Sequence, residues 1–273
     1  MSYPTVAIIL INYNGVEDTI ECITSLQKVE YSHYKIIVID NASKGNDVEI
    51  LKKKYGENIH LIASEQNLGF SGANNLGIRY ALQQNFPYML LLNNDTVVSE
   101  KFLTPLVTIA EQEKNVGIVT PKIYYYSHPQ KIWMAGGYLS ILRVGGYLYQ
   151  KEKKQSFYDI TFASGCCMLI KKEVIEKVGL WDENYFLYVE DTDYCYRVLQ
   201  HNYRIVYVSE SIIYHKINTT TKKENVLLPL YYATRNRLYF VEKFLKNYAY
   251  IVAMIYLCFN MLLKHLSWKF NKK

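Results

Sequence analysis

Three carboxylates gather within four positions in the segment YVEDTDYCYR, where Glu190, Asp191 and Asp193 stand. Like charges this close raise the pKa of at least one carboxyl group, and a partly desolvated carboxylate is a better base at neutral pH. The cluster therefore indicates general-base chemistry. A structural alternative remains, because acidic side chains near a helix start are favoured by the helix dipole. Asp193 could also pair with Arg197, four residues later on the same helix face.

Two further residues, far apart in the sequence, are of types that can bind a metal ion. Asp95 closes the segment LLLNNDT, and His215 follows the strand-like SIIYH. Oxygen ligands suit hard cations such as Mg²⁺, while neutral imidazole suits Mn²⁺ better than Mg²⁺. Each residue also has a structural reading: Asp95 as the cap of a turn at Thr96, and His215 as a histidine of the core.

Short apolar runs precede these candidates and predict the elements that position them. Residues 5–11, 35–40, 60–63 and 88–92 are expected strands, and 17–28 and 71–84 are expected helices. This alternation predicts half of a doubly wound sheet of parallel strands covered on both faces. Ligands bind beyond the carboxyl ends of such strands. Polar residues stand at those ends: Asn12, Tyr13 and Asn14; Asp40 and Asn41; Glu65, Gln66 and Asn67; Asn93, Asn94 and Asp95.

The second half of the chain has a less regular pattern. Residues 115–170 are expected to be rich in β-structure, with turns at Gly136–Gly137 and Gly145–Gly146 and a solvated lysine loop at 151–154. Further predictions are helices at 171–178 and 191–200 and a strand at 203–208. No internal repeat or linker divides the sequence, so we expect one domain with a C-terminal extension.

Composition excludes several classes of protein. The 273 residues are 50% apolar and 21% charged, which excludes a disordered chain, collagen and a disulfide miniprotein. The five cysteines are odd in number and lack C-x-x-C spacing, so a reducing, cytoplasmic compartment is expected. The N-terminal segment MSYPTVAIILINYNG has neither a basic leader nor a cleavage site, and predicts a first strand instead of a signal peptide.

Taken in order, these segments resemble family 2 glycosyltransferases, the inverting enzymes with the GT-A fold, in the branch that includes bacterial rhamnosyltransferases. The likeness covers roughly residues 5–240 and rests on eight features: VAIILINYNG, IIVIDNAS, NLGFSGANNLGI, LLLNNDT, ASGCCMLIKKEVIEKVGLWDENYF, YVEDTDYCYR, His215 and the later RN pair. The resemblance implies an α/β GT-A domain over residues 1–240, with a mostly parallel sheet flanked by helices. Its nucleotide-binding half would be 1–100, its acceptor-binding half 101–240, and 241–273 would form a basic amphipathic helical extension.

The same resemblance implies an activity and roles for individual residues. The activity is transfer of rhamnose or a hexose from a nucleoside-diphosphate sugar, with dTDP or UDP favoured, to a polysaccharide or lipid-linked glycan. Asp191 would be the base that takes the proton of the acceptor hydroxyl, and Asp95 and His215 would hold Mn²⁺ or Mg²⁺. Donor-binding residues would be Asn12, Tyr13, Asp40, Asn41, Asn67, Gly69, Asn74, Asn93, Asn94, Gly165, backed by Ser164, and Arg235, with Asn236 beside it. Acceptor-binding residues would be Trp181, Asp182, Glu183 and Glu190.

One position departs from the family pattern and keeps an alternative open. Asn93 stands where the family usually carries the first Asp of Asp-x-Asp, which leaves Asp95 as a single charged ligand. The alternative is therefore a catalytically impaired sugar-nucleotide-binding or scaffolding subunit, although the intact acidic cluster at 190–193 weighs against it. Nucleotidyl transfer is less favoured, because NYNGVED after the first strand has no basic residue for phosphate.

Positive charge is concentrated at the C-terminal end. The net charge is +6, and residues 235–273 carry eight Lys or Arg and one acid. Residues 248–263 are mostly apolar, and as a helix would extend roughly 24 Å, less than the roughly 30 Å of a bilayer core. We expect this segment to lie in the headgroup region of the inner membrane face. A buried or homodimer-forming helix is the alternative, and no nucleic acid is expected. The flanking bases are Lys243, Lys246, Lys264 and Lys269.

Overall fold

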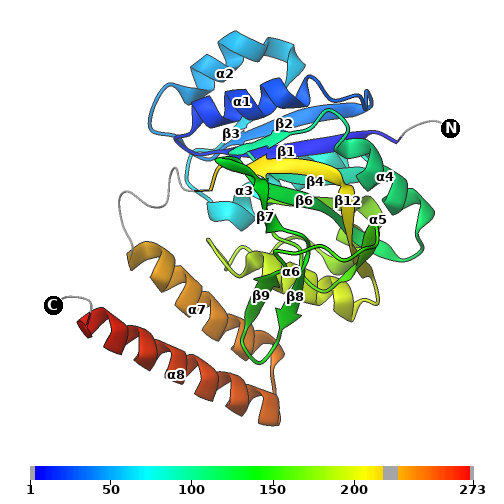
Figure 1. Cartoon of the computed structure of the whole chain (residues 1–273). Coiled ribbons are helices and arrows are strands. Elements are labelled where there is room, and N and C mark those ends of the chain that lie inside the picture. The colour runs from blue at the N-terminus through cyan, green and yellow to red at the C-terminus, as the bar shows by residue number, and fades with distance from the viewer. Residues whose placement is uncertain (1–3, 218–226, 271–273) are drawn as a thin grey trace.

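The computed structural model describes residues 4–217 and 227–270, and one ten-stranded sheet organises them (Figure 1). Along the sheet the order is β10 (Phe157–Ile160), β12 (Arg204–His215), β6 (Val116–Tyr125), β11 (Cys167–Lys171), β4 (Tyr88–Asn93), β1 (Val6–Asn12), β2 (Tyr34–Asp40) and β3 (His60–Ala63). Beside this path, β5 (Thr96–Val98) pairs with β12, and β7 (His128–Met134) pairs with β6. A separate ribbon consists of β8 (Gly137–Ser140) and β9 (Gly145–Leu148).

The first half of the chain folds as its apolar runs predict. The strands β4, β1, β2 and β3 are parallel neighbours, and Asn12 stands opposite Asp40 where β1 and β2 end. Helices α1 (Val16–Leu26) and α3 (Gly69–Gln83) occupy the two predicted helical stretches. A further helix, α2 (Asp47–Tyr55), precedes a short 3₁₀ turn at Gly56–Asn58, and neither is among the predicted elements.

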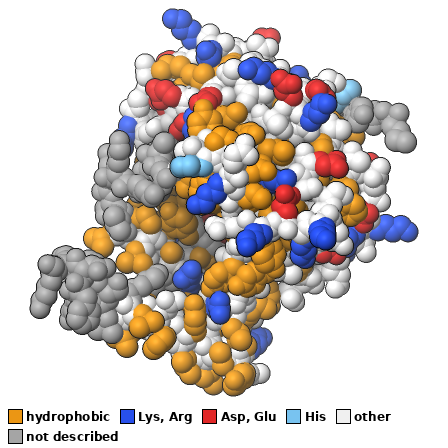
Figure 2. Space-filling view, viewed as in Figure 1, with side chains coloured by type: hydrophobic (Ala, Val, Ile, Leu, Met, Phe, Trp, Pro, Cys, Tyr) orange, Lys and Arg blue, Asp and Glu red, His pale blue; other side chains and the backbone are white. Residues whose placement is uncertain are grey.

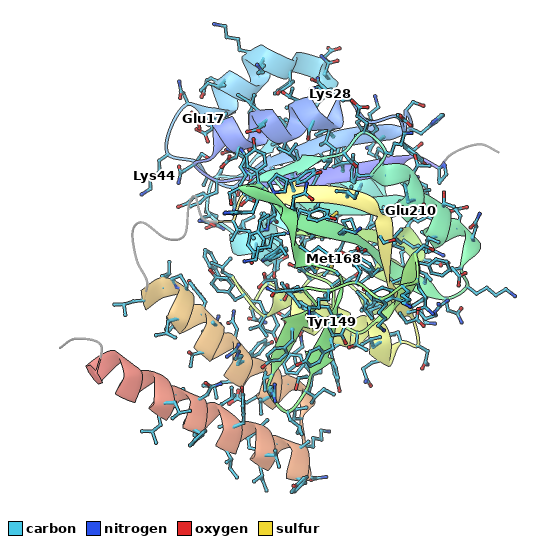
Figure 3. The ribbon with its side chains drawn as sticks, viewed as in Figure 1. Glu17, Lys28, Lys44, Tyr149, Met168 and Glu210 are labelled. Atoms are coloured by element: carbon cyan, nitrogen blue, oxygen red, sulfur yellow. The ribbon has the colours of Figure 1, made fainter. Side chains whose placement is uncertain are left out.

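The central strands are buried on both faces, because successive side chains of a strand point to opposite sides of the sheet. Val6, Ile8 and Leu10 of β1 pack in the same layer as α1, α2 and α4 (Leu103–Gln112). Ala7 and Ile9 pack in the opposite layer, with α3, α5 (Lys172–Val178) and α6 (Glu190–Gln200). Met168 of β11, labelled in Figure 3, belongs to this second layer. Two-sided packing fixes the strands whose carboxyl ends carry the candidate residues.

The second half adds strands of mixed direction. β11 runs antiparallel to both of its neighbours, β4 and β6, while β12 is parallel to β6. The strand predicted at 203–208 continues to His215, because an irregularity between Val208 and Ile212 lets the chain resume its pairing with β6. This continuation carries His215 to the turn that follows β4.

The predicted turns and loops agree with the structure in part. Gly136 has a positive φ of 79° and lies between β7 and β8, as expected of a turn glycine. The turn predicted at Gly145–Gly146 is wrong, because these residues begin β9 and the chain reverses at 141–144 instead. Residues 151–154 lie in an exposed stretch without regular structure, which confirms the predicted loop.

A helical hairpin follows the sheet. It consists of α7 (Leu227–Phe244) and α8 (Asn247–Phe270), which lie at one end of the molecule in Figure 1. The boundary predicted between residues 240 and 241 falls inside α7, where Phe240 and Val241 are buried against Tyr185 and Val189 of the body. Among the helices of the described residues, none has both the length and the apolarity needed to cross a bilayer.

Candidate active site at the carboxyl ends of the strands

The turn after β4 holds Asp95 beside His215. Antiparallel pairing of β5 with β12 places His215 opposite Thr96, and the Lys216 amide donates to the Asp95 carbonyl at 2.9 Å. Asp95 Oδ1 and His215 Nε2 are 3.1 Å apart. The Thr96 hydroxyl closes the turn by donating to the Asn93 carbonyl at 2.7 Å. The Asp95 carboxylate is therefore directed to His215 instead of capping the turn.

This pair has the spacing of two ligands of one divalent cation. Ligand atoms about 2.1 Å from an octahedral ion, at right angles to each other, lie about 3.0 Å apart. Burial lowers the pKa of His215, but Cys166 and Asp95 outweigh it and raise that pKa to about 10. A cation would displace this proton, so its affinity would rise with pH. Within the described residues, no group of three or more His, Cys, Asp or Glu side chains is placed to hold a metal ion.

Asp191 lies in the first turn of α6 and is held by backbone amides. Its Oδ1 accepts from the Thr192 amide at 2.8 Å, and its Oδ2 accepts from the Gly165 amide at 3.3 Å. Burial raises the pKa of Asp191 to about 6, although these hydrogen bonds favour the charged form. A carboxylate with this pKa is ionised at neutral pH and is still basic enough to accept a proton in a reaction.

The other two acids of the cluster have different environments. Glu190 is 8% exposed, and burial followed by the charge of Asp191 raises its pKa well above the ordinary value. Its Oε2 atom is buried without a hydrogen-bond partner among the described residues. Asp193 is fully buried and pairs with Arg197 and Lys243, each at 2.6 Å. The structural reading therefore holds for Asp193, whereas Glu190 and Asp191 form a coupled pair of carboxyl groups.

A two-residue turn before β11 joins the Asp191 site to the Asp95 site. The Gly165 amide binds Asp191, and the carbonyl of the next residue, Cys166, accepts from the Asn93 amide at 2.9 Å. The Cys166 side chain also interacts with His215. Consecutive Cα atoms are about 3.8 Å apart. Two acidic sites nearly a hundred positions apart in the sequence are thus connected through adjacent residues.

The predicted donor residues at the ends of β1 and β2 form a buried polar network. Asn12 Nδ2 donates to Asp40 Oδ1 at 2.8 Å and to Asp47 Oδ2 at 2.9 Å, and its Oδ1 accepts from Thr19 at 2.7 Å. Ser43 adds bonds from both its amide and its hydroxyl to Asp40. Asp40 is only 2% exposed, so its predicted direct contact with a nucleobase does not fit this structure. Asn12 and Asp40 instead fix the loops at this edge.

Other predicted donor residues surround that network. Tyr13 is 38% exposed and is not a core aromatic, so its ring is accessible to a base or ribose. Asn94 donates to the Thr19 hydroxyl at 2.8 Å, which ties the turn after β4 to α1. Asn93 is partly buried at the end of β4. Asn74, by contrast, is buried and donates to the Phe70 carbonyl one helical turn earlier, so its contact is structural.

The loop before α3 joins the two halves of the domain. Asn41 donates to Asn67 Oδ1 at 3.0 Å and to the Gly69 carbonyl at 3.2 Å, and accepts from the Leu68 amide at 2.8 Å. Gly69 has a φ of +70°, and a Cβ there would lie 2.3 Å from the Phe186 carbonyl oxygen. Only glycine allows this contact. Asn41, Asn67 and Gly69 therefore hold the donor-side loop against the segment that leads to Asp191.

The acceptor-side prediction is corrected for Trp181. This ring is 2% exposed and packs between Tyr194, stacked at 5.1 Å, and Phe70 at 5.8 Å, so it offers no open face to a sugar. Glu183 accepts from Asn75 and from Arg79, each at 2.8 Å. Asp182 accepts from Tyr239 and Lys243 of α7. These two carboxylates fasten the loop between α5 and α6, and acceptor binding by them stays a prediction.

Three residues fix the site from a distance: Asn75 and Lys243, which are outside the predicted site residues, and Asn236, which was predicted to lie beside Arg235 at the diphosphate. Asn75 binds both the amide and the carbonyl of Trp181, at 3.0 and 2.8 Å. Asn236 donates to two successive carbonyls before Asp191, and Lys243 pairs with Asp193. Arg235, predicted to reach the diphosphate, donates to the Asn184 carbonyl at 2.9 Å, and phosphate contact stays a prediction. Only the RN pair gave a signal in the sequence, and it did not reveal these contacts.

The mixed sheet covered by helices has the architecture of the GT-A class of glycosyltransferase folds. The crystal structure of GalNAc-T7 with UDP, GalNAc and Mn²⁺ has a TM-score of 0.71 at 15% identity, over 88% of this chain and 48% of that one. The mannosyltransferase PcManGT from Pyrobaculum calidifontis, in complex with GDP-Man and Mn²⁺, has a TM-score of 0.65 at 15% identity, over 94% and 70%. These similarities confirm the predicted fold.

The chain itself belongs to Glycosyl transferase family 2, whose profile matches residues 7–179. It is 30% identical over 201 residues to the low-salt glycan biosynthesis hexosyltransferase Agl10 of Haloferax volcanii, covering 73% of this chain and 63% of that protein. It is 26% identical over 227 residues to the dTDP-rhamnosyl transferase RfbF of Shigella flexneri, covering 76% and 71%. The chain matches half the length of a poly-β-1,6-N-acetyl-D-glucosamine synthase of Staphylococcus epidermidis, at 26% identity. The predicted family is confirmed.

Proposed function

We propose that this chain transfers a sugar from a nucleoside-diphosphate sugar to an acceptor hydroxyl with inversion of configuration. The observation that carries the proposal is the Gly165–Cys166 turn, whose adjacent residues contact Asp191 on one side and Asn93 and His215 on the other. A general base and a cation site linked in this way would serve the attacking hydroxyl and the leaving diphosphate of one displacement reaction. Family membership supports the same reaction class.

In this mechanism Asp191 accepts the proton of the acceptor hydroxyl as its oxygen attacks the anomeric carbon. The bond from that carbon to the diphosphate oxygen breaks, and its electron pair leaves with the diphosphate. Asp95 and His215 would hold a divalent cation, Mn²⁺ or Mg²⁺, which offsets the charge developing on the leaving group. Burial and the neighbouring Asp191 raise the pKa of Glu190 well above its ordinary value, so Glu190 is the member of the pair that would hold a proton and leave the negative charge on Asp191.

Rhamnose or a hexose carried by dTDP or UDP is the donor that we favour. RfbF, named as a dTDP-rhamnosyl transferase, supports dTDP, and the solved neighbours carry UDP and GDP-Man. The exposed ring of Tyr13 beside the Asn12–Asp40 network offers a stacking surface for base or ribose. Base selection would then come from the loops that this buried network shapes.

A donor screen tests the reaction. The purified chain is incubated with UDP-, dTDP- and GDP-sugars and Mn²⁺, and release of nucleoside diphosphate is followed together with donor binding by calorimetry. We expect saturable binding and slow hydrolysis of one dTDP- or UDP-sugar, with water replacing the acceptor. Binding without consumption by the wild type would favour the alternative, a catalytically impaired donor-binding subunit. If no donor binds or is consumed, the proposal fails.

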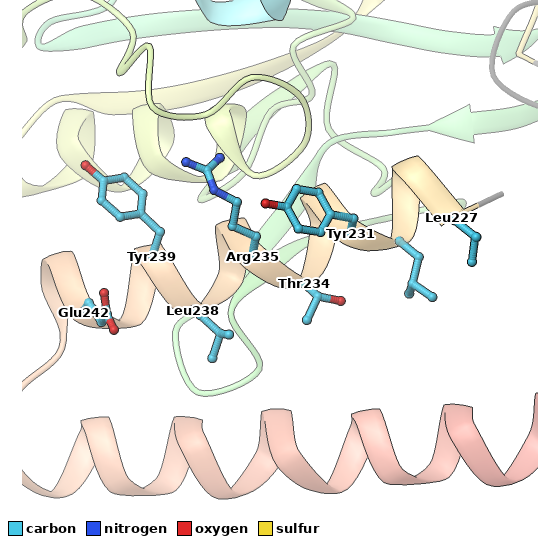
Figure 4. A pocket seen from close by; sticks show the side chains of 8 residues that line it. Leu227, Tyr231, Thr234, Arg235, Leu238, Tyr239 and Glu242 are labelled. Atoms are coloured by element: carbon cyan, nitrogen blue, oxygen red, sulfur yellow. The ribbon is translucent and has the colours of Figure 1, made fainter. Parts of the chain in front are cut away.

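The acceptor that we favour is a polysaccharide or lipid-linked glycan at the inner membrane face, reached through the hairpin. One side of α8 exposes apolar residues at helical spacing: Tyr248, Ile251, Ile255, Phe259 and Leu262. Figure 2 shows hydrophobic side chains with Lys and Arg among them at this end of the molecule. A groove of about 740 Å³ also runs along α7, lined by Leu227, Leu230, Tyr231, Thr234, Arg235, Leu238, Tyr239 and Glu242 (Figure 4). Apolar rows with basic neighbours suit an anionic lipid surface.

Substitution of the exposed apolar side chains of α8 tests membrane contact. Ile255→Asn with Phe259→Asn should lower partition onto vesicles containing anionic lipid at least about tenfold, since burying one such side chain contributes roughly 1.5–3 kcal/mol. Flotation and sedimentation with vesicles measure it. Lys52→Ser with Lys53→Ser, which removes two exposed charges from α2, is the matched control and should bind as the wild type does. Unchanged flotation of the α8 variant, with loss of a dimer, would favour the homodimer reading instead.

A further inference from the structure

The turn that leads into α6 has an unfavourable backbone conformation. Tyr188 and Val189 have φ values of 70° and 74°, in the left-handed region that β-branched residues rarely adopt. A residue held in this region costs on the order of 1–3 kcal/mol and persists only when its surroundings enforce it. Glu190 and Asp191 follow directly. The direction in which the Asp191 carboxylate points therefore depends on what enforces this turn.

Asn236 of α7 is placed to enforce it. This side chain is fully buried, and its Nδ2 donates to the carbonyls of Leu187 and Tyr188, both at 2.8 Å. Its Oδ1 accepts from Arg235 Nη1 at 3.0 Å. A primary amide has two N–H donors, and here both are used on successive carbonyls of one turn. An aspartate of the same size would supply neither donor.

α7 is itself fastened on both sides of the turn. On the N-terminal side of the turn, Arg235 donates to the Asn184 carbonyl and Tyr239 donates to Asp182. After it, Lys243 pairs with Asp193 in the first turn of α6. Apolar contacts add to this, because Val189 shares a buried cluster with Phe240 and Val241. Asn236 therefore stands on a helix whose position relative to α6 is fixed, as a clamp requires.

We infer that Asn236 is a positioning residue, which holds the turn at residues 187–189 in its left-handed form and thereby directs Asp191. The inference rests on the proposed function, because it assigns Asn236 a part in the same reaction. Asn236 acts through the turn, from α7, and does not itself exchange a proton. It also gives the hairpin a role at the reacting centre besides surface contact.

Kinetics of Asn236 variants test the inference. Asn236→Ala and Asn236→Asp should each lower kcat about 10–100-fold, since a misplacement near 1 Å costs about that much. The donor KM should change less than about threefold, because both Nδ2 hydrogen bonds of Asn236 go to the turn before Asp191 and not to the strand ends predicted to bind the donor. Asn236→Ser, which keeps one donor, should lose less and remains informative if the alanine variant does not fold. The control Asn58→Ala makes the same change at an exposed position outside the site.

Two further measurements separate positioning from general stability. Glycine adopts positive φ without strain, so Asn236→Ala should cost at least about threefold less in a Val189→Gly background than in the wild type. Hydrogen exchange of amides 188–193 should be faster in Asn236→Ala, and this readout is independent of activity. Equal kcat in Asn236→Ala and Asn58→Ala, or an equal loss in both backgrounds, overturns the inference. A wild type without turnover, in which the variant still speeds exchange, would instead overturn the proposed function.

Discussion

Asp191→Asn is expected to lower kcat about 10³-fold, within the range that a general base contributes. The amide keeps the size of the carboxyl group, and its single oxygen can still accept from one of the Gly165 and Thr192 amides, but it cannot take the acceptor proton. The donor KM should stay within about threefold of the wild type. Rates of nucleoside diphosphate release, measured against the donor found in the screen, give both constants.

The pH dependence of kcat in the wild type also tests whether Asp191 is the general base. Because the base must be ionised, kcat should fall about tenfold per unit as the pH drops below the Asp191 pKa of about 6, and should level above it. In Asp191→Asn this limb should disappear. The native state binds the Asp191 proton more tightly than the unfolded chain, so the charged form costs stability at neutral pH. Thermal unfolding of Asp191→Asn should therefore occur at the wild-type temperature or higher. A fully active variant would exclude Asp191 as the base.

Asp95→Asn should have the second largest effect, through the cation. Asp95 is the carboxylate that faces His215 in the proposed site. Its loss should raise the Mn²⁺ concentration for half-maximal activity at least about 100-fold. Even the mutation of a residue that only hydrogen-bonds to a metal ligand typically lowers metal affinity or activity by about 10–100-fold. Activity against Mn²⁺ concentration, and Mn²⁺ binding followed by electron paramagnetic resonance, measure this change.

A reverse substitution provides the matched comparison. Asn93→Asp restores the first carboxylate of Asp-x-Asp beside Asp95, at a position that is only partly buried. It should lower the required Mn²⁺ concentration about tenfold, which corresponds to roughly 1.4 kcal/mol. Identical metal curves for the wild type, Asp95→Asn and Asn93→Asp would show that no cation is held here, and would leave the charge of the leaving group to be met by Arg or Lys.

The scaffold of the site could be predicted from the sequence because it follows from periodicity. Runs such as residues 5–11 and 35–40 are apolar on both faces, which suits parallel strands covered on both sides, so the existence of these strands and the positions of their polar ends could be predicted. Asp95 and His215 were likewise found as candidates because each ends an apolar run. Their pairing at 3.1 Å, however, depends on β5 and the long β12, and β5 is too short to give a pattern.

The remaining contacts could not be predicted, because they join segments far apart in sequence through single polar side chains. Nothing in the spacing of Asp193 shows that Lys243, fifty residues later, neutralises it, so its structural role had to come from the fold. Trp181 could equally have been a surface aromatic, and only its packing between Phe70 and Tyr194 places it in the core. The left-handed turn at Tyr188–Val189 violates local preference, and such conformations are set by their surroundings.

The Gly165–Cys166 turn links two parts of the candidate site through one peptide unit. A planar peptide does not stretch, so the Gly165 amide, which binds Asp191, and Cys166, which contacts Asn93 and His215, stay at a fixed separation. The surrounding loops can change in length or sequence, and so admit sugars of another size, without changing the separation of Gly165 and Cys166. Inserting a single residue between Gly165 and Cys166 would keep every predicted site residue, but it would change the distance between the contact to Asp191 and the contact to His215.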